Sequence, residues 1–176
     1  MNPNILVFLH LAFFLACNSP SPRRPIVKSS TPVLEKSVTL NKKIVALEQA
    51  YIKRFVAKDT LHDYINSNKG FWYCYLHKNS SKPRPYKGNQ VFYEQEIQSL
   101  DGTVLLSKEA LGIQSYVVDK EHRMKGLQEG IKIMRLGEEM QFVFSSFVAY
   151  RSKGNLEFNV GPNQPIVCRI KLISIK

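Results

Sequence analysis

One stretch decides the fold, and it reads Gly126-Leu127-Gln128-Glu129-Gly130-Ile131-Lys132-Ile133-Met134-Arg135-Leu136-Gly137-Glu138-Glu139-Met140-Gln141-Phe142-Val143-Phe144. Apolar residues recur in it at helical spacing, at Met124, Leu127, Ile131 and Met134, and predict a short amphipathic helix. Gly137 stands where a left-handed residue would end that helix. Beyond it, apolar residues at 140, 142 and 144 alternate with Gln141 and Val143, a pattern typical of a half-buried strand.

The sequence on either side predicts an antiparallel sheet. Residues 71–76 are aromatic and strand-like, and residues 91–97 alternate, with Val91, Tyr93, Gln95 and Ile97 on one face. Asp101-Gly102 is a hairpin signal between that strand and a return strand at 103–106. Further strands are expected at 116–118 and after residue 165, the last with Ile166, Cys168, Ile170 and Leu172 on one face. The predicted class is α+β, an antiparallel sheet curled around one short helix, with an amino-terminal helical extension.

Composition excludes several classes of function. The 176 residues, 44% of them hydrophobic, suit one domain with an appendage. The net charge of +11 is spread along the chain without a basic stripe interleaved with aromatics, so no nucleic-acid partner is expected. The three cysteines lack metal-ligand spacing, and the histidines assemble no catalytic triad. We expect neither a metal nor a cofactor.

The amino-terminal residues predict a lipid-anchored envelope protein. Residues 5–16 form an apolar run broken only by His10, too short to span a bilayer and typical of a signal peptide covering residues 1–16. Ala16-Cys17 looks like a bacterial lipobox, so Cys17 is the predicted lipidation site. An ordinary cleaved secretory leader is the alternative, since residues 1–4 carry no Lys or Arg. Residues 18–30 lack Asp and Glu, which favours a domain that faces the periplasm.

A proline-rich tether, residues 17–31, leads to a helical extension at 32–69. The first helix, opened by Thr31-Pro32, has an apolar stripe formed by Leu40, Ile44, Leu47, Tyr51 and Phe55. A second short helix is expected from Thr60 to near Gly70. The first helix either packs on its own domain or serves as a dimerisation arm of a homodimer. In an oxidising compartment Cys74 and Cys168 could pair, but their strand positions favour two free, buried thiols.

The order and spacing of Gly126, Gly130, Met134, Gly137 and the Ala149-Tyr150 pair resemble FKBP-type peptidyl-prolyl cis-trans isomerases. The resemblance covers residues 87–176, within a domain at 70–176. A narrower likeness, to the gliding-motility-associated isomerase lipoproteins of gliding bacteria, lies in the segments 23–26, 70–73, 101–104, 107–112, 116–121 and 161–163. The resemblance implies isomerisation of X-Pro bonds in proline-containing segments of envelope proteins. The alternative is a non-catalytic chaperone or scaffold that holds extended chains.

The family pocket, carried over by position, implies Tyr150 as the catalytic residue. It implies substrate-binding roles for Gln95, Leu105, Leu106, Arg123, Met124, Leu127 and Cys168. Compared with the family, Gln95 replaces a tyrosine, Leu106 an aspartate, Leu127 a tryptophan and Cys168 an aromatic residue. Arg151 replaces a glycine, and this replacement is expected to reshape the loop. Each of these residues could instead be ordinary core. A pocket with fewer rings and one added amide predicts weak activity.

Overall fold

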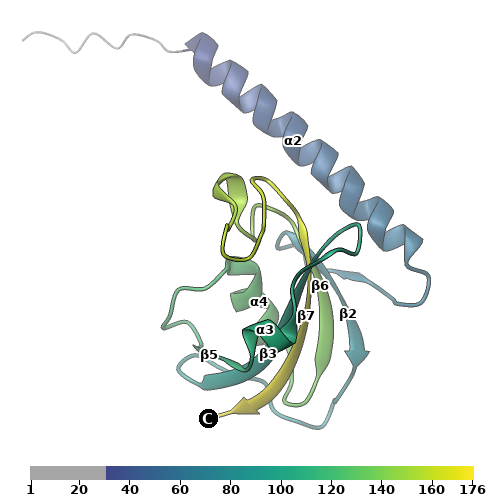
Figure 1. Cartoon of the computed structure of the whole chain (residues 1–176), viewed down its shortest axis with the longest axis vertical. Coiled ribbons are helices and arrows are strands. Elements are labelled where there is room, and N and C mark those ends of the chain that lie inside the picture. The colour runs from purple at the N-terminus through teal and green to yellow at the C-terminus, as the bar shows by residue number, and fades with distance from the viewer. Residues whose placement is uncertain (1–30) are drawn as a thin grey trace, which may run out of the picture. The chain divides into compact units, whose positions relative to one another are not determined.

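The computed structural model describes residues 31–176, of which residues 37–176 form one compact unit. The predicted signal peptide, Cys17 and most of the tether lie outside the described residues. The elements are helix α2 (Thr31–Lys58), strands β1 (Ile65–Asn66), β2 (Phe71–His77), β3 (Gln90–Ser99) and β4 (Val104–Leu106), helix α3 (Lys108–Leu111), strand β5 (Gln114–Val117), helix α4 (Lys125–Ile133), strand β6 (Glu139–Phe144), a 3₁₀ helix (Arg151–Lys153) and strand β7 (Ile166–Ile175) (Figure 1). Within residues 31–176, no helix combines the length and the apolar character that crossing a membrane requires.

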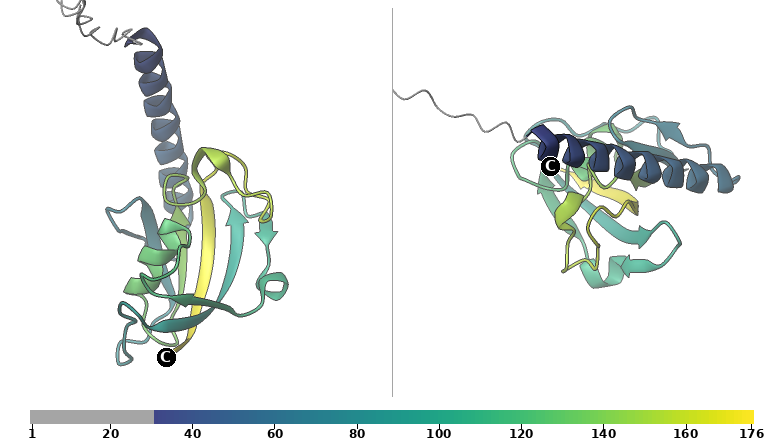
Figure 2. Two further views of the ribbon diagram at one scale, coloured as in Figure 1. Left: turned by 90° about the vertical axis from the view of Figure 1, so that its left-hand side faces the viewer. Right: turned by 90° about the horizontal axis from the view of Figure 1, so that it is seen from above.

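All strands belong to one antiparallel sheet, in the order β1-β2-β6-β7-β3-β4, with β5 also paired to β3. The sheet curls, and α4 lies against its inner face (Figures 1 and 2). The Asp101-Gly102 turn joins β3 to β4 as predicted, with Gly102 at φ +92°. The α+β prediction is confirmed, and the four-residue helix α3, whose N-cap is Ser107, is an addition to it.

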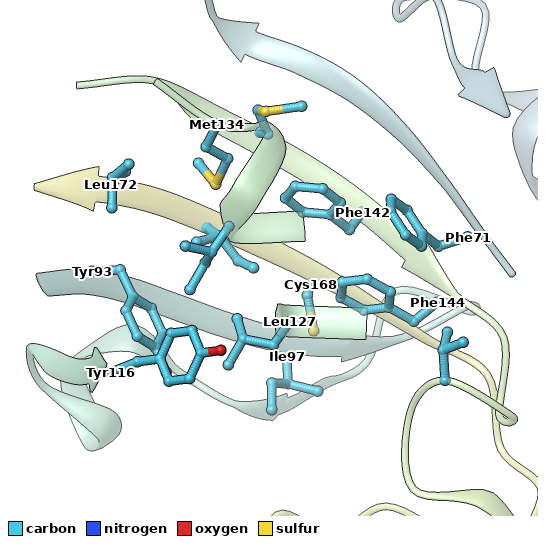
Figure 3. Packing of buried hydrophobic residues seen from close by; sticks show 14 of the residues in the cluster. Phe71, Tyr93, Ile97, Tyr116, Leu127, Met134, Phe142, Phe144, Cys168 and Leu172 are labelled. Atoms are coloured by element: carbon cyan, nitrogen blue, oxygen red, sulfur yellow. The ribbon is translucent and has the colours of Figure 1, made fainter. Parts of the chain in front are cut away.

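The inner face of the sheet and α4 enclose the main core. The predicted buried face of β3, from Val91 to Ile97, and that of β7, from Ile166 to Leu172, are both confirmed. Figure 3 shows Phe71, Phe142 and Phe144 at one end of this core and Tyr93 and Tyr116 at the other. The rings of Phe142 and Phe144 stack with centroids 5.4 Å apart. Glycines on α4 let the helix approach these rings, since a Cβ at Gly126 would lie 2.4 Å from Phe144.

The outer face of β6 is also buried, which corrects the half-buried prediction for that strand. Gln141 and Val143, expected to face solvent, are both buried. For Val143 the reason is the carboxy-terminal half of α2, where Ile52 packs with Leu100, Val143 and Val167. Gln141 instead bonds to Tyr64 in the segment after α2. The helix therefore contacts its own domain, one of the two expected alternatives. The predicted stripe forms only part of this contact face, because Phe55 packs against the cluster whereas Leu40, Leu47 and Tyr51 are exposed.

The predicted second helix does not form. After α2, Asp59 accepts hydrogen bonds from the side chains of His62 (2.9 Å) and Tyr64 (3.1 Å), and Gln141 donates to the Tyr64 hydroxyl at 2.5 Å. Burial would raise the pKa of Asp59, but the bonds from His62 and Tyr64 outweigh it and lower that pKa. This network holds residues 59–64 as a loop leading into β1, so side-chain bonding overrides the capping signal.

Gly137 does not cap α4, although its left-handed conformation is confirmed at φ +79°. The helix ends at Ile133, and Gly137 lies in the turn before β6, where its N–H donates to the Leu172 carbonyl at 2.8 Å. The buried carboxylate of Glu138 stabilises the same turn by accepting from the backbone N–H of Arg135 (2.7 Å) and Asn79 (3.1 Å). The glycine therefore shapes a turn rather than a helix end.

The two described thiols are both buried and free. Cys168 belongs to the inner core, whereas Cys74 lies on the outer face, near Tyr64. Burial raises the pKa of Cys168 to about 12. Side chains on opposite faces of a sheet point apart, so a disulfide between these two is excluded by geometry.

Candidate active site

A pocket of about 350 Å³ opens between β3, the start of α4 and the loops on either side. We call it the Tyr150 pocket. It is lined by Tyr93, Gln95, Leu111, Gln114, His122, Arg123, Met124, Leu127, Tyr150, Asn155 and Phe158. Five of these were predicted from the sequence: Gln95, Arg123, Met124, Leu127 and Tyr150. Segments up to 65 positions apart in the chain therefore meet at one cavity, as Tyr93 and Phe158 show.

Tyr150 lies at the end of the loop that follows β6, just before the 3₁₀ helix. Its ring meets Phe158 edge to face, with centroids 6.0 Å apart. Burial, with Cys168 and Tyr93 nearby, raises the pKa of Tyr150 well above its ordinary value, so the hydroxyl keeps its proton. Among residues 31–176 that hydroxyl has no hydrogen-bond partner. It is therefore free to donate to a ligand in the pocket.

Gln95 lines the pocket from β3 and connects it to Cys168 beneath. The Gln95 amide nitrogen donates to the Cys168 Sγ at 3.6 Å, a weak bond because a sulfur is a poor acceptor. Cys168 itself has no exposed surface. The predicted contact of Cys168 with substrate is therefore corrected: its side chain lies under Gln95 and does not form the wall.

Leu105 and Leu106 are half-buried against the main core and do not line the Tyr150 pocket. The register places them further along β3 than Gln95, since Leu106 pairs with Ile97 and Val104 with Gln98. An irregularity between these two pairs shifts Leu105 as well. The predicted wall position of both leucines is displaced along the strand.

The start of α4 contributes Met124 and Leu127 to the pocket. Met124 is the N-cap residue, and its carbonyl accepts from the Gln128 N–H at 3.1 Å. Its own N–H bonds to no other backbone group of the described residues, so it can donate to a ligand. The Arg123 guanidinium donates to the Ser115 carbonyl at 3.0 Å and lies 3.6 Å from the Glu121 carboxylate. The bond to Ser115 ties the Arg123 side chain to β5.

Sequence reasoning missed six of the lining residues: Tyr93, Leu111, Gln114, His122, Asn155 and Phe158. Tyr93 had a signal, because it lies two residues before Gln95 on the same face of β3. Burial raises the pKa of Tyr93 to about 12, although Arg123 lowers it. Phe158 and Asn155 come from an irregular loop whose sequence has no period, so no pattern predicted them.

Arg151, which stands where the resemblance implies a glycine, adopts a left-handed backbone conformation. Its φ of +54° lies in the left-handed region, which costs a non-glycine residue roughly 1–2 kcal/mol. Three contacts offset this cost: its N–H donates to the Ser146 carbonyl at 2.8 Å, its Nε donates to the Phe147 carbonyl at 3.1 Å, and its guanidinium lies 5.0 Å from the Phe147 ring centre.

A family model and a curated relative that match this chain carry the same family description. Residues 81–173 match the family model of FKBP-type peptidyl-prolyl cis-trans isomerases. The probable FKBP-type isomerase FkpA of Neisseria meningitidis is 30% identical over 127 residues, which make up 72% of this chain and 44% of that relative. The chain therefore spans less than half the length of this curated relative.

Solved structures agree at the level of the fold. The amino-terminal domain of FKBP42 from Arabidopsis thaliana is 18% identical, with a TM-score of 0.58 over 65% of this chain and 92% of that one. A peptidyl-prolyl cis-trans isomerase from Pseudomonas syringae is 20% identical, with a TM-score of 0.60 over 77% of this chain and 95% of that one. The match of the family model, which covers more than half of the chain, decides the assignment. This chain belongs to the family of FKBP-type peptidyl-prolyl cis-trans isomerases.

Proposed function

We propose that this protein isomerises X-Pro bonds in exported proteins of the cell envelope. The observation that carries the proposal is the free hydroxyl of Tyr150 in a half-enclosed pocket walled by Tyr93, Met124, Leu127 and Phe158. A proline ring fits between such apolar walls, and Tyr150 then donates to a carbonyl of the bound segment. The free N–H of Met124 offers a second donor to the same backbone.

The reaction needs no acid, base or metal. Amide resonance creates the barrier of about 20 kcal/mol and places partial negative charge on the carbonyl oxygen. Twisting the bond removes that charge, so a site with little water favours the twisted form over the planar one. Lowering the barrier by about 4 kcal/mol speeds exchange roughly a thousandfold. Gln95 brings a polar amide to this wall and opposes the effect, so the expected activity is weak.

The test of isomerase activity is the cis-trans exchange rate of an X-Pro peptide, measured by NMR with the purified full chain in detergent. We expect acceleration that is proportional to the protein concentration. Exchange that stays at the uncatalysed rate at high protein concentration would refute the proposed activity.

The second candidate is a chaperone or scaffold without catalysis. Two exposed apolar side chains favour it: Ile113 lies between pocket-lining residues 111 and 114, and Leu156, which is 96% exposed, lies between lining residues 155 and 158. Such residues can hold an extended apolar chain at the mouth of the pocket. Suppression of client aggregation that survives Tyr150→Phe, without acceleration of peptide exchange, would favour this function over isomerisation.

We also propose that Cys17 carries a lipid anchor and that the domain faces the periplasm. The support is the Ala16-Cys17 junction after a short apolar run, and the absence of acidic residues at 18–30. The likeness to the isomerase lipoproteins of gliding bacteria makes motility components the proposed clients. Fatty-acid labelling of a Cys17→Ser chain should fail, and protease added to intact cells should spare the domain.

A homodimer through α2 is the proposed quaternary structure. The exposed apolar residues of α2 within the compact unit, among them Leu40, Leu47 and Tyr51, support it. Sedimentation of the full chain in detergent should give twice the monomer mass, and Leu47→Lys should halve it. A monomer at all concentrations would contradict this proposal.

A further inference from the structure

A buried carboxylate on α2 holds the loop that leads to Tyr150. Glu48 lies on α2, and only 8% of its surface is exposed. One of its oxygens accepts the backbone N–H of Ser146 at 2.5 Å, and the other accepts the Ser146 hydroxyl at 2.6 Å. These two residues are 98 positions apart in the chain. Ser146 is itself buried, so both of its donors depend on this partner.

The Ser146 contact continues directly to Tyr150. The carbonyl of Ser146 accepts from Arg151 N–H at 2.8 Å, and that of Ser145 accepts from Ala149 N–H at 3.0 Å. The residues on both sides of Tyr150 are thus bonded to the pair Ser145-Ser146. A displacement of Ser146 would therefore be passed on to the backbone of Tyr150.

Among the described residues, the Glu48 side chain forms hydrogen bonds only to Ser146. Its carboxylate forms no ion pair with any cationic side chain of residues 31–176. Burial of a charged group is costly unless the group is hydrogen-bonded, and bonds to a carboxylate are stronger than neutral ones. A residue that only packed α2 on the sheet would be apolar, as Ile52 is one turn further along. A carboxylate at this position is therefore explained by its hydrogen bonds to Ser146 and not by packing.

We propose that Glu48 is a positioning residue for catalysis, which holds the loop at Ser146 and thereby fixes Tyr150 in the pocket. In this proposal α2 does not only separate the proposed anchor from the domain; it also positions the loop that carries Tyr150. The proposal rests on the proposed isomerase activity only for its kinetic consequence. The mechanical consequence, an ordered backbone from Ser146 to Arg151, does not depend on any activity.

The test compares three variants of the full chain in detergent. Glu48→Ala removes both acceptors and leaves two buried donors unpaired. Glu48→Gln keeps an acceptor for the Ser146 N–H, and its amide can donate to the Ser146 hydroxyl oxygen. Ile52→Val is the matched control, because it loosens the packing of α2 without touching Ser146. Trp72, the only tryptophan of the chain, packs in the cluster that contains Ile52, so its emission reports whether α2 stays docked.

We expect Glu48→Ala to lower kcat/KM about fivefold to thirtyfold and to speed amide hydrogen exchange at Ser146 and Arg151, with unchanged Trp72 emission. Glu48→Gln and Ile52→Val should stay within about twofold of the wild type in kcat/KM. Unchanged exchange at Ser146 and Arg151 in Glu48→Ala would overturn the proposal. So would a shifted Trp72 emission in that variant, since Glu48 would then be needed only for docking. If the wild type shows no isomerase activity, the amide hydrogen exchange at Ser146 and Arg151 alone decides whether Glu48 holds this loop.

Discussion

Replacing Gly126 by alanine should destabilise the domain, because the added methyl group has no room. Gly126 is the second residue of α4, and a Cβ there would lie 2.4, 2.7 and 2.9 Å from three atoms of the Phe144 ring. The ring cannot retreat freely, since Phe144 is fully buried, stacked on Phe142 and 5.5 Å from the Phe71 ring. The start of α4 must therefore move away from β6.

Two opposing effects set the magnitude. Alanine is favoured over glycine in a helix by at most about 1 kcal/mol, and less in the first turn. Overpacking of a core costs roughly 1–3 kcal/mol, and contacts this short lie at the upper end of that range. We expect a net loss of about 1–2 kcal/mol, which lowers Tm by roughly 3–8 °C for a domain of this size. Leu127 and Met124 flank the site of the clash, so kcat/KM should fall as well.

The assay is urea unfolding together with the Tm, and Gly130→Ala is the matched control. A Cβ at Gly130 would lie 3.1 Å from the Phe142 ring, a tight contact that a shift of a few tenths of an ångström relieves. Its gain in helix propensity should offset that strain, leaving the free energy of unfolding within about 0.5 kcal/mol of the wild type. Equal stability of the two variants, or a stabilised Gly126→Ala, would refute the packing described for α4.

Three further predictions concern single side chains. Gln95→Tyr should raise kcat/KM in the peptide exchange assay, because it replaces a polar amide at the wall by a ring; an unchanged or lower value would contradict the role given to Gln95. Arg151→Gly should be more stable to urea than Arg151→Ala by about 1 kcal/mol, because only alanine keeps the strain of φ +54° after the contacts to Phe147 are lost; the reverse order would show that this strain is absent. Hydrogen bonds from Lys132 (2.8 Å) and Lys69 (2.7 Å) lower the pKa of Glu129. Its contribution to the free energy of unfolding is therefore present above the unfolded-state pKa of about 4.3 and is lost as pH falls through the pKa of the folded state. Glu129→Gln should accordingly cost about 0.5–1 kcal/mol at pH 7 and nothing near pH 2, and a cost independent of pH would contradict it.

Local patterns in the sequence predict those parts of the fold that local forces determine. The alternation from Val91 to Ile97 places that strand face correctly in the core, and the spacing of Leu127 and Ile131 does the same for α4. The pattern at Gln141 and Val143 misleads, because both contact segments from much earlier in the chain: Ile52 of α2 packs with Val143, and Gln141 bonds to Tyr64. Periodicity along one strand contains no information about what covers its other face.

The sequence likewise predicts some residues of the candidate site and misses others. Positions that the family motif fixes, such as Tyr150 and Leu127, do meet at one pocket. Cys168 does not reach its wall because it is fully buried beneath Gln95, and Leu105 does not because the pairing of β4 with β3 is irregular. Neither feature is visible in the spacing of the sequence. Phe158 escaped prediction since irregular loops have no period. Glu48 did carry a signal, a carboxylate beside an apolar stripe, but its partner could be identified only in three dimensions.

The central claim, that Tyr150 acts in catalysis through its hydroxyl, is tested most directly by exchange NMR on an X-Pro peptide with the wild type and with Tyr150→Phe. The substitution keeps the ring against Phe158 and removes only the free donor. The account predicts weak but measurable acceleration by the wild type. It also predicts a loss of about 1–2 kcal/mol of transition-state stabilisation in the variant, or roughly a fivefold to thirtyfold lower kcat/KM. Equal turnover by the two proteins would contradict it.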